Sequence, residues 1–157
     1  MSDQIASATD IYRLAQKYQR QGDLAEARSC LMKVLALEPD HSEAIHSLGN
    51  IDAREGRLED AERLIRKAIA IDPLKAAFLN SLGNLMRSRG DLEEAVKAYQ
   101  LAVQLQPGLA AVHNNLAEVL LRSGDPEGAV ERCFKALKAD PNYAGAYDTM
   151  GTELLNR

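Results

Sequence analysis

Asparagine side chains recur in this sequence at a fixed separation. Asn50 and Asn84 lie 34 residues apart, and so do Asn80 and Asn114, with Asn115 directly after Asn114. A side-chain amide carries both hydrogen-bond donors and an acceptor. Amides placed at one height along a groove can therefore pair with the N–H and C=O groups of an extended peptide, whatever its side chains. If the chain places these amides along one groove, their chemistry would suit recognition of a polypeptide backbone.

Residues for catalysis or metal binding do not converge in the sequence. His41, His46 and His113 share no spacing that would place two of them on one helical face with a cysteine or a carboxylate. A zinc site needs several converging ligands, so we expect each histidine to lie in a turn or at the surface. The sequence contains no P-loop, dinucleotide-binding or nucleophile-elbow pattern. It predicts no catalytic residues, no metal site and no cofactor, and a chain that is not itself an enzyme.

Composition narrows the classes of partner. The net charge of −4 over 157 residues is not that of a basic, nucleic-acid-binding domain, so we expect no nucleic-acid partner. No stretch approaches the roughly 18 continuous apolar residues of a membrane span, and the first residues do not resemble a secretory signal. Cys30 and Cys133 are expected to be reduced, partly buried thiols. These features predict a cytoplasmic protein that does not insert into membranes.

A second periodic feature indicates which elements position the amides. Four prolines are spaced by 34 residues, and a glycine lies 17 residues before each: Pro39, Pro73, Pro107 and Pro141, with Gly22, Gly56, Gly90 and Gly124. Such a period is typical of helical repeat arrays. Glycine ends one helix in the left-handed conformation and proline breaks the next. Asp23, Asp91 and Asp125 follow three of the glycines as expected N-cap acceptors.

The spacing of these glycines and prolines predicts the domain organisation and the helices. Residues 1–7 form a flexible N-terminus or a helix extension, and residues 8–157 form one repeat domain. Its repeats are 8–41, 42–75, 76–109 and 110–143, with a partial repeat at 144–157. Apolar residues at three- and four-residue steps predict helices near 8–21, 24–37, 42–55, 58–71, 76–89, 92–105, 110–123, 126–139 and 144–156. The expected fold is all-α, a right-handed superhelical array of antiparallel helix pairs.

The repeats resemble the tetratricopeptide repeat (TPR) family. The Leu-Gly pair of that family's first helix, or a close variant, occurs five times: Leu14-Ala15, Leu48-Gly49, Leu82-Gly83, Leu116-Ala117 and Met150-Gly151. The second-helix alanines and the terminal proline also fall on their family positions. The aromatic place that follows Leu-Gly departs from the pattern most clearly at Asp52. The resemblance covers residues 8–157 and implies a TPR solenoid.

In TPR arrays the first helix of each repeat lines a concave groove, and the resemblance implies which places point into it. Those places hold ten candidate peptide-binding residues: Asn50, Asn80, Asn84, Asn114, Asn115, Arg13, Arg20, Arg54, Arg87 and Arg122. Similar asparagine ladders occur in the TPR arms of O-linked N-acetylglucosamine transferases. Because arginine grips carboxylates bidentately, the excess of arginines over acids indicates an acidic partner. Two other interpretations stay open: the asparagines after Leu-Gly assist packing, and the arginines pair with acids on neighbouring helices.

The function expected from these features is that of a protein–protein interaction scaffold. It would bind an extended peptide or protein segment in the concave groove. One alternative is the substrate-recruiting N-terminal arm of a larger group-transfer enzyme, such as a glycosyltransferase, whose catalytic domain is absent. A second alternative is a self-assembly module, because the last helix would expose apolar side chains: Tyr147, Met150, Leu154 and Leu155. Such a face predicts a homodimer through the C-terminal end.

Overall fold

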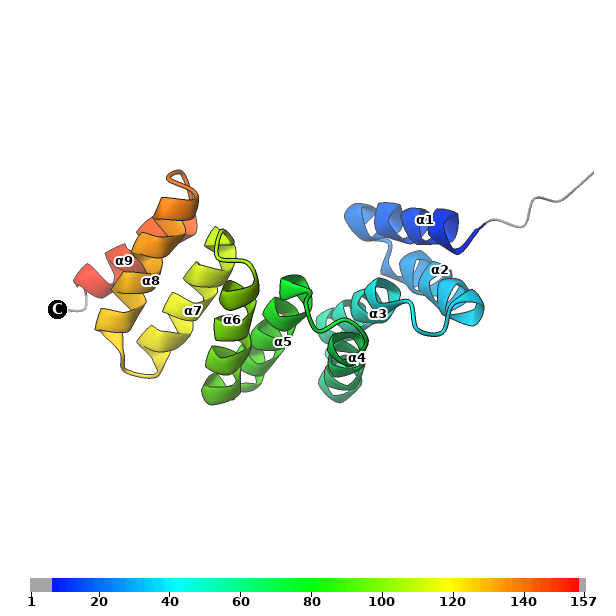
Figure 1. The fold of residues 1–157 in the computed structure, drawn as a ribbon, viewed down its shortest axis with the longest axis horizontal. Coiled ribbons are helices and arrows are strands. Elements are labelled where there is room, and N and C mark those ends of the chain that lie inside the picture. Colours follow the sequence, from blue (N-terminus) through cyan, green and yellow to red (C-terminus); the bar gives the residue numbers. More distant parts are fainter. Residues whose placement is uncertain (1–6, 156–157) are drawn as a thin grey trace, which may run out of the picture. The chain divides into compact units, whose positions relative to one another are not determined.

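The computed structural model describes the backbone of residues 7–155 and the side chains up to Thr152. Every regular element in this range is an α-helix (Figure 1). The helices are α1 (Ala8–Gln21), α2 (Leu24–Leu37), α3 (Ser42–Arg54), α4 (Leu58–Ile71), α5 (Ala76–Arg89), α6 (Leu92–Leu105), α7 (Ala110–Arg122), α8 (Pro126–Ala139) and α9 (Ala144–Leu155). The predicted all-α repeat array is confirmed, with α3 and α7 one residue shorter than predicted. Residues 1–6 and 156–157 lie outside the described range.

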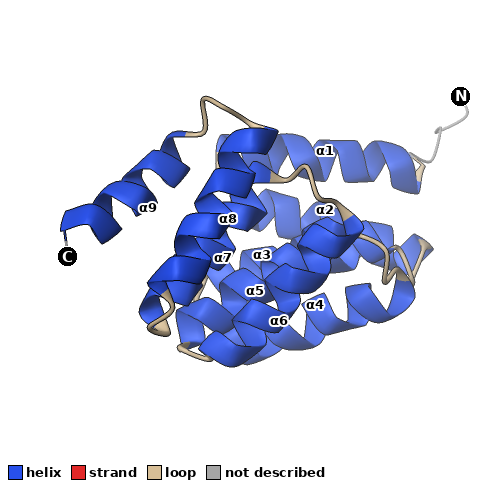
Figure 2. Cartoon of the chain, turned by 60° about the vertical axis from the view of Figure 1, so that its left-hand side comes forward, coloured by secondary structure: helices blue, strands red, loops and turns tan. Residues whose placement is uncertain are grey.

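Left-handed glycines end the first helix of each full repeat, as the sequence predicts. Their φ angles lie between 80° and 86°: Gly22, Gly56, Gly90 and Gly124. A side chain would be strained in this conformation. Short loops then lead into the next helix (Figure 2). Asp91 and Asp125 cap α6 and α8 by accepting hydrogen bonds from backbone N–H groups, but Asp23 makes no side-chain cap bond to α2. The expectation of an N-cap acceptor at Asp23 is therefore wrong.

The chain divides into two compact units, residues 1–73 and 74–157. In unit 1, α1 packs on α2, α2 on α3 and α3 on α4. In unit 2, α5 packs on α6, α6 on α7 and α7 on α8, while α9 packs against both α7 and α8. Helix α5 also contacts α7. The surface formed by α5, α7 and α9 is called here the first-helix face of unit 2.

Alternating small and large residues on the second helices form the core. The small ones are alanines that recur at the period of the repeat and are at most 1% exposed: Ala27, Ala61, Ala95 and Ala129, with Ala68, Ala102 and Ala136. Between them lies a larger side chain, also at most 1% exposed: Leu31, Ile65, Tyr99 or Cys133. The alanines let paired helices approach closely, and the larger residue fills the space between them.

Glycine in the first helix makes room for that larger residue. A Cβ atom on Gly83 would lie 2.5 Å from Cε1 of Tyr99, and one on Gly49 would lie 3.0 Å from Cγ1 of Ile65. Where the second helix carries the smaller Cys133, the first helix carries Ala117 in the same core cluster. The Leu-Gly pairs are therefore explained by packing. In each pair the glycine, which has no side chain, lies opposite a large side chain of the second helix.

The apolar face expected on the last helix is described only in part. Met150 packs against the core cluster of α7 and α8. Tyr147 is 57% exposed, and its hydroxyl donates a hydrogen bond to the carbonyl oxygen of Pro141 at 3.1 Å. The side chains of Leu154 and Leu155 lie outside the described residues. A homodimer through this end therefore stays a prediction.

We predict that Gly83→Ala lowers the free energy of unfolding by about 1–3 kcal/mol, because the added methyl group overlaps the buried Tyr99 ring. Gly151 is the matched control, since it occupies the same place in its repeat and nothing lies within 4 Å of a Cβ built there. Gly151→Ala should leave stability unchanged or raise it by up to about 1 kcal/mol. Urea denaturation followed by circular dichroism measures both. Equal stability of the two variants would contradict the role of Gly83 in packing.

Candidate functional site

Three of the five predicted asparagines form one hydrogen-bonded group on the first-helix face of unit 2. Asn115 of α7 donates from Nδ2 to Oδ1 of Asn80 at 3.1 Å and to Oδ1 of Asn84 at 3.3 Å, both on α5. All three side chains are partly buried. These residues are called the asparagine cluster below. They bring α5 and α7 together through side-chain amides.

Tyr99 of α6 positions the asparagine cluster from the core side. Its hydroxyl donates a hydrogen bond of 2.7 Å to Oδ1 of Asn84. Burial raises the pKa of Tyr99 to about 12, so the hydroxyl remains a donor at neutral pH. The sequence places Tyr99 in the core but does not reveal its second role. The available signal is that a hydroxyl-bearing residue stands where the other repeats carry Leu31, Ile65 and Cys133.

The remaining polar atoms of the asparagine cluster are open to a ligand. The Nδ2 groups of Asn80 and Asn84 and the Oδ1 of Asn115 have no hydrogen-bond partner among the described residues. None of these three atoms is buried. The cluster thus offers two amide donors and one amide acceptor to whatever lies on this face. An extended peptide needs donors for its C=O groups and an acceptor for its N–H groups.

Asn114 faces a different environment although it follows Asn80 by one repeat. Its side chain is only 3% exposed. Its Nδ2 donates to Oε1 of Glu118 at 2.8 Å, and its Oδ1 accepts from Oγ1 of Thr149 at 3.0 Å. The amide therefore joins α7 to α9 rather than meeting open surface. Any effect of Asn114 on a ligand would pass through Glu118 or Thr149.

Asn50 lies in unit 1, and its side chain is hydrogen-bonded to a histidine. Its Nδ2 is 3.2 Å from Nε2 of His46. Burial lowers the pKa of His46 to about 4, although Glu43 opposes the shift. The ring is therefore neutral near pH 7, and Nε2 accepts the hydrogen bond because the amide nitrogen can only donate. The repeat spacing of Asn50 and Asn84 does not give them the same partners.

Two of the three histidines are not turn or surface residues, which corrects the expectation from the sequence. His41 does lie at the start of α3, where Nδ1 accepts from the backbone N–H of Ala44 at 3.3 Å. His46 lies within α3 and is partly buried. His113 lies within α7 and is only 5% exposed. Helix packing around these places decided their burial, and residue type alone did not indicate it.

The two predicted arginines of unit 2 each link α5 to α7. Arg87 of α5 forms an ion pair with Glu118, which also accepts from Asn114. Arg122 is exposed, and its Nη1 lies 3.5 Å from the carbonyl oxygen of Arg87. A hollow of about 380 Å³ between α7 and α9 is lined by Glu118, Arg122 and Thr149, among others. Pairing with an acid on a neighbouring helix is therefore the observed state of Arg87.

The predicted arginines of unit 1 are exposed. Arg13 lies 3.4 Å from Asp10 on its own helix, and Nε of Arg20 donates to the carbonyl oxygen of Gln16 at 3.3 Å. Arg54 has no hydrogen-bond or ion-pair partner within the described part of the chain. Exposed ion pairs of this kind contribute little to stability. These three arginines and the asparagine cluster belong to different units of the chain.

The helix pairs of the structure agree with the family models that match the sequence. A family model described as "Tetratricopeptide repeat" matches residues 5–73, and one described as "TPR repeat" matches residues 83–124. The chain belongs to the tetratricopeptide repeat family. None of the curated protein sequences that were compared with it matches.

Solved structures of other TPR-like chains are similar to this one. The PilF protein of Pseudomonas aeruginosa has a TM-score of 0.89 at 27% identity, over 95% of this chain and 68% of that one. MamA has a TM-score of 0.79 at 25% identity, over 90% of this chain and 83% of that one. A mutant O-GlcNAc transferase of Thermobaculum terrenum has a TM-score of 0.81 at 28% identity, over 88% of this chain. Only 27% of the transferase chain is covered.

Metal-binding and membrane-spanning features are absent from the part of the TPR chain that the structure describes. No group of three or more His, Cys, Asp or Glu residues in the described range could hold a metal ion. None of the described helices is both long enough and apolar enough to cross a membrane. Cys30 and Cys133 are unpaired, buried thiols. Burial raises the pKa of Cys133.

Asp52, which replaces the aromatic residue of the TPR pattern, is the centre of an ion cluster in unit 1. The side chain is 3% exposed. Its Oδ1 accepts from Nη2 of Arg28 on α2 at 2.5 Å and from Nε of Arg57 at 2.9 Å. Glu55 binds the same two arginines. The cluster joins α2 to the end of α3, and the sequence shows the substitution without indicating these partners.

We predict that Asp52→Asn lowers the free energy of unfolding by roughly 1–3 kcal/mol near neutral pH, because two arginines lose a charged acceptor. Burial opposes ionisation of Asp52, but hydrogen bonds from Arg28 and Arg57 outweigh it and lower the pKa of the carboxyl group. The stabilisation is therefore present above the ordinary aspartate pKa of about 3.9 and is lost as pH falls through the lower folded value.

Urea denaturation at several pH values tests this prediction. The stability gap between the native chain and Asp52→Asn should narrow as pH falls below about 4. Asp60→Asn is the control, because Asp60 pairs with Arg63 at 3.0 Å on the exposed surface of one helix. That change should alter stability by less than about 0.5 kcal/mol. A gap for Asp52→Asn that stays constant with pH would exclude its ionised carboxylate as the cause.

Proposed function

We propose that the chain is a protein-interaction scaffold and that the first-helix face of unit 2 holds an extended polypeptide by its backbone. The asparagine cluster is the observation that supports this proposal. Its amides are fixed by one another and by Tyr99, yet two donors and one acceptor remain unpaired among the described residues. Amides held in this way lose little conformational entropy when a ligand binds.

Backbone recognition fits this face better than charge recognition. The charge of Arg87 is balanced by Glu118, and the hollow between α7 and α9 carries Arg122 together with the acidic residues Glu118 and Asp148. A carboxylate ligand would meet opposing charges there. A peptide backbone is neutral and carries the complementary hydrogen-bonding groups at every residue. The proposed ligand is therefore an extended segment with varied side chains.

The substrate-recruiting arm of a larger group-transfer enzyme is a second candidate function. The observation in its favour is the similarity to the O-GlcNAc transferase structure, which the chain matches over 27% of that protein. The two proposals share the asparagine cluster and differ in what happens to the bound segment. Expression with a flanking catalytic domain, if the gene encodes one, distinguishes them. Loss of modification of a peptide substrate on mutation of the cluster would support the second.

We predict that removal of the asparagine cluster weakens peptide binding by about 1–3 kcal/mol, because peptide groups lose their partners. The probe is a peptide selected on the native chain from a displayed library of unstructured sequences. Asn80→Ala combined with Asn115→Ala is compared with Gln100→Ala, which removes an exposed amide from the second helix α6. Fluorescence anisotropy measures each affinity. An equal loss in both variants would contradict binding at the cluster.

Changes in the peptide test whether its backbone is recognised. N-methylation of one central residue removes an N–H group and should weaken binding at least as much as the double variant does. Alanine substitution of the same residue keeps the backbone and should have the smaller effect. The reverse order would show that side chains, rather than backbone groups, are recognised.

A further inference from the structure

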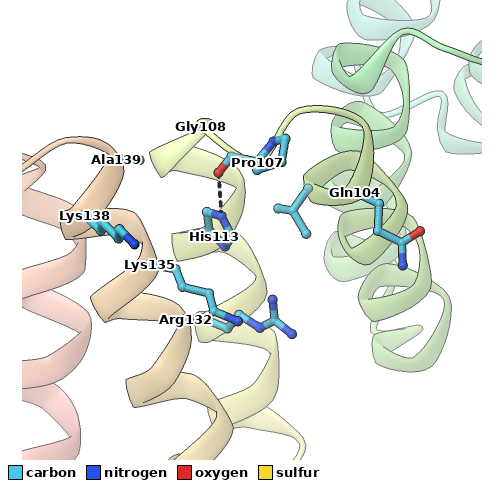
Figure 3. Close-up of a pocket in the computed structure, with 9 residues that line it drawn as sticks. Gln104, Pro107, Gly108, His113, Arg132, Lys135, Lys138 and Ala139 are labelled. Atoms are coloured by element: carbon cyan, nitrogen blue, oxygen red, sulfur yellow. Dashed lines mark hydrogen bonds between the residues drawn. The ribbon is translucent and has the colours of Figure 1, made fainter.

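A second recessed surface in unit 2 carries a different chemistry. It is a pocket of about 550 Å³, formed on one side by α6 with the loop that follows it and on the other by α8 (Figure 3). Val103 and Pro107 contribute apolar surface on the α6 side. Arg132, Lys135 and Lys138 line the pocket from α8. None of these residues belongs to the asparagine cluster, so a ligand of this pocket is independent of the proposed function.

The α8 side of the pocket is a row of three cations. They stand at successive three-residue steps, so the row from Arg132 to Lys138 spans about 9 Å along the helix axis. Lys135 pairs with Glu131 at 2.6 Å on the exposed surface. Arg132 and Lys138 have no ion-pair or hydrogen-bond partner in the described range. Lys138 lies in the last turn of α8, where a cation favours the helix dipole, but Arg132 lies in mid-helix and has no such explanation.

His113 also lines this pocket and carries a buried polar atom without a partner among the described residues. The side chain is 5% exposed, and Nε2 lies 2.9 Å from the carbonyl oxygen of Pro107, the contact marked in Figure 3. A carbonyl only accepts, so Nε2 carries the hydrogen. Nδ1 is buried and finds no partner among the described residues. Burial lowers the pKa of His113; the bond to Pro107 opposes this, while Arg132 and Lys135 add to it. Burial is the main cause of this lowered pKa, and the two cations beside the ring act in the same direction.

We propose that this pocket binds an acidic peptide segment in which two carboxylates flank an apolar residue. Alternate side chains of an extended strand point in opposite directions, and residues two apart are separated by about 6.6 Å. Two carboxylates at that separation match the α8 row, which is too long for one small anion. The residue between them points to the apolar surface of Val103 and Pro107. The net charge of −4 makes this row a local exception within an acidic chain.

This proposal moves the acidic partner expected from the sequence from the first-helix face to the pocket between α6 and α8. On the first-helix face, Arg87 is neutralised by Glu118. In the pocket, Arg132 and Lys138 keep their charges unbalanced by described residues. An acidic segment gains from cations that lack a partner, because a paired cation must first lose its own acid.

Binding of two capped five-residue peptides tests the proposal. One carries a central valine flanked by two aspartates, and the other carries asparagines in place of the aspartates. The acidic peptide should bind the native chain at least about tenfold more tightly in calorimetry, and added salt should weaken it. Equal affinity of the two peptides would overturn the proposal. So would competition by inorganic phosphate at the same concentration, because it would indicate a site for small anions only.

Matched charge variants locate the site. Arg132→Gln combined with Lys138→Gln should weaken the acidic peptide by about tenfold or more. Lys33→Gln combined with Lys67→Gln removes the same charge from exposed places on second helices of unit 1 and should change affinity by less than about twofold. Equal losses in the two variants would show that only net charge matters, and would overturn the assignment to the pocket.

The histidine resonances give a second readout that does not depend on mutation. Bound carboxylates offset the field of Arg132 and Lys135, so the acidic peptide should move the NMR titration midpoint of His113 to higher pH. His46 lies in unit 1 and serves as the internal reference, with an unchanged midpoint. An unmoved His113 at saturating peptide would contradict binding in the pocket.

Discussion

Tyr99 occupies the space that Gly83 leaves open on α5, and from that position its hydroxyl holds Asn84. The contact serves packing and the candidate site together. The buried ring fixes the distance between α5 and α6, while the hydroxyl at its end orients one member of the asparagine cluster. Asn115 then extends the same network from α7. Because the site is built directly on the core, unpaired amides can be held in place without a dedicated loop.

The fold could be predicted because its signals are local and repeated. Left-handed glycines, terminal prolines and apolar residues at helical spacing occur at the same places in each full repeat. A helix boundary that is ambiguous in one repeat can therefore be assigned from the others. Individual side chains were less predictable. Asp23 has the residue type of an N-cap but makes no cap bond. His113 has the type of a surface residue but is buried in α7. These outcomes depend on the helices that surround each place, which the sequence pattern does not specify.

The candidate site shows the same limit. Repeat spacing gave Asn80 and Asn114 one predicted role, yet Asn114 is enclosed by Glu118 and Thr149. The partners of an amide come from the next repeat, and residues there are not identical. The cationic row of α8 was not predicted, because the expected groove is lined by first helices and α8 is a second helix. Unit 2 consequently offers two chemically different surfaces, a neutral one of amides and a cationic one beside apolar residues.

Asn80 and Asn84 are proposed to hold free amide donors for a peptide backbone, whereas Asn114 joins α7 to α9. Side-chain amide resonances distinguish these roles within one sample. We expect saturation with a peptide selected on the native chain to shift the Nδ2H₂ signals of Asn80 and Asn84 in a two-dimensional ¹H–¹⁵N spectrum and to leave that of Asn114 in place. Shifts confined to Asn114, or no shift at any of the three, would contradict the account.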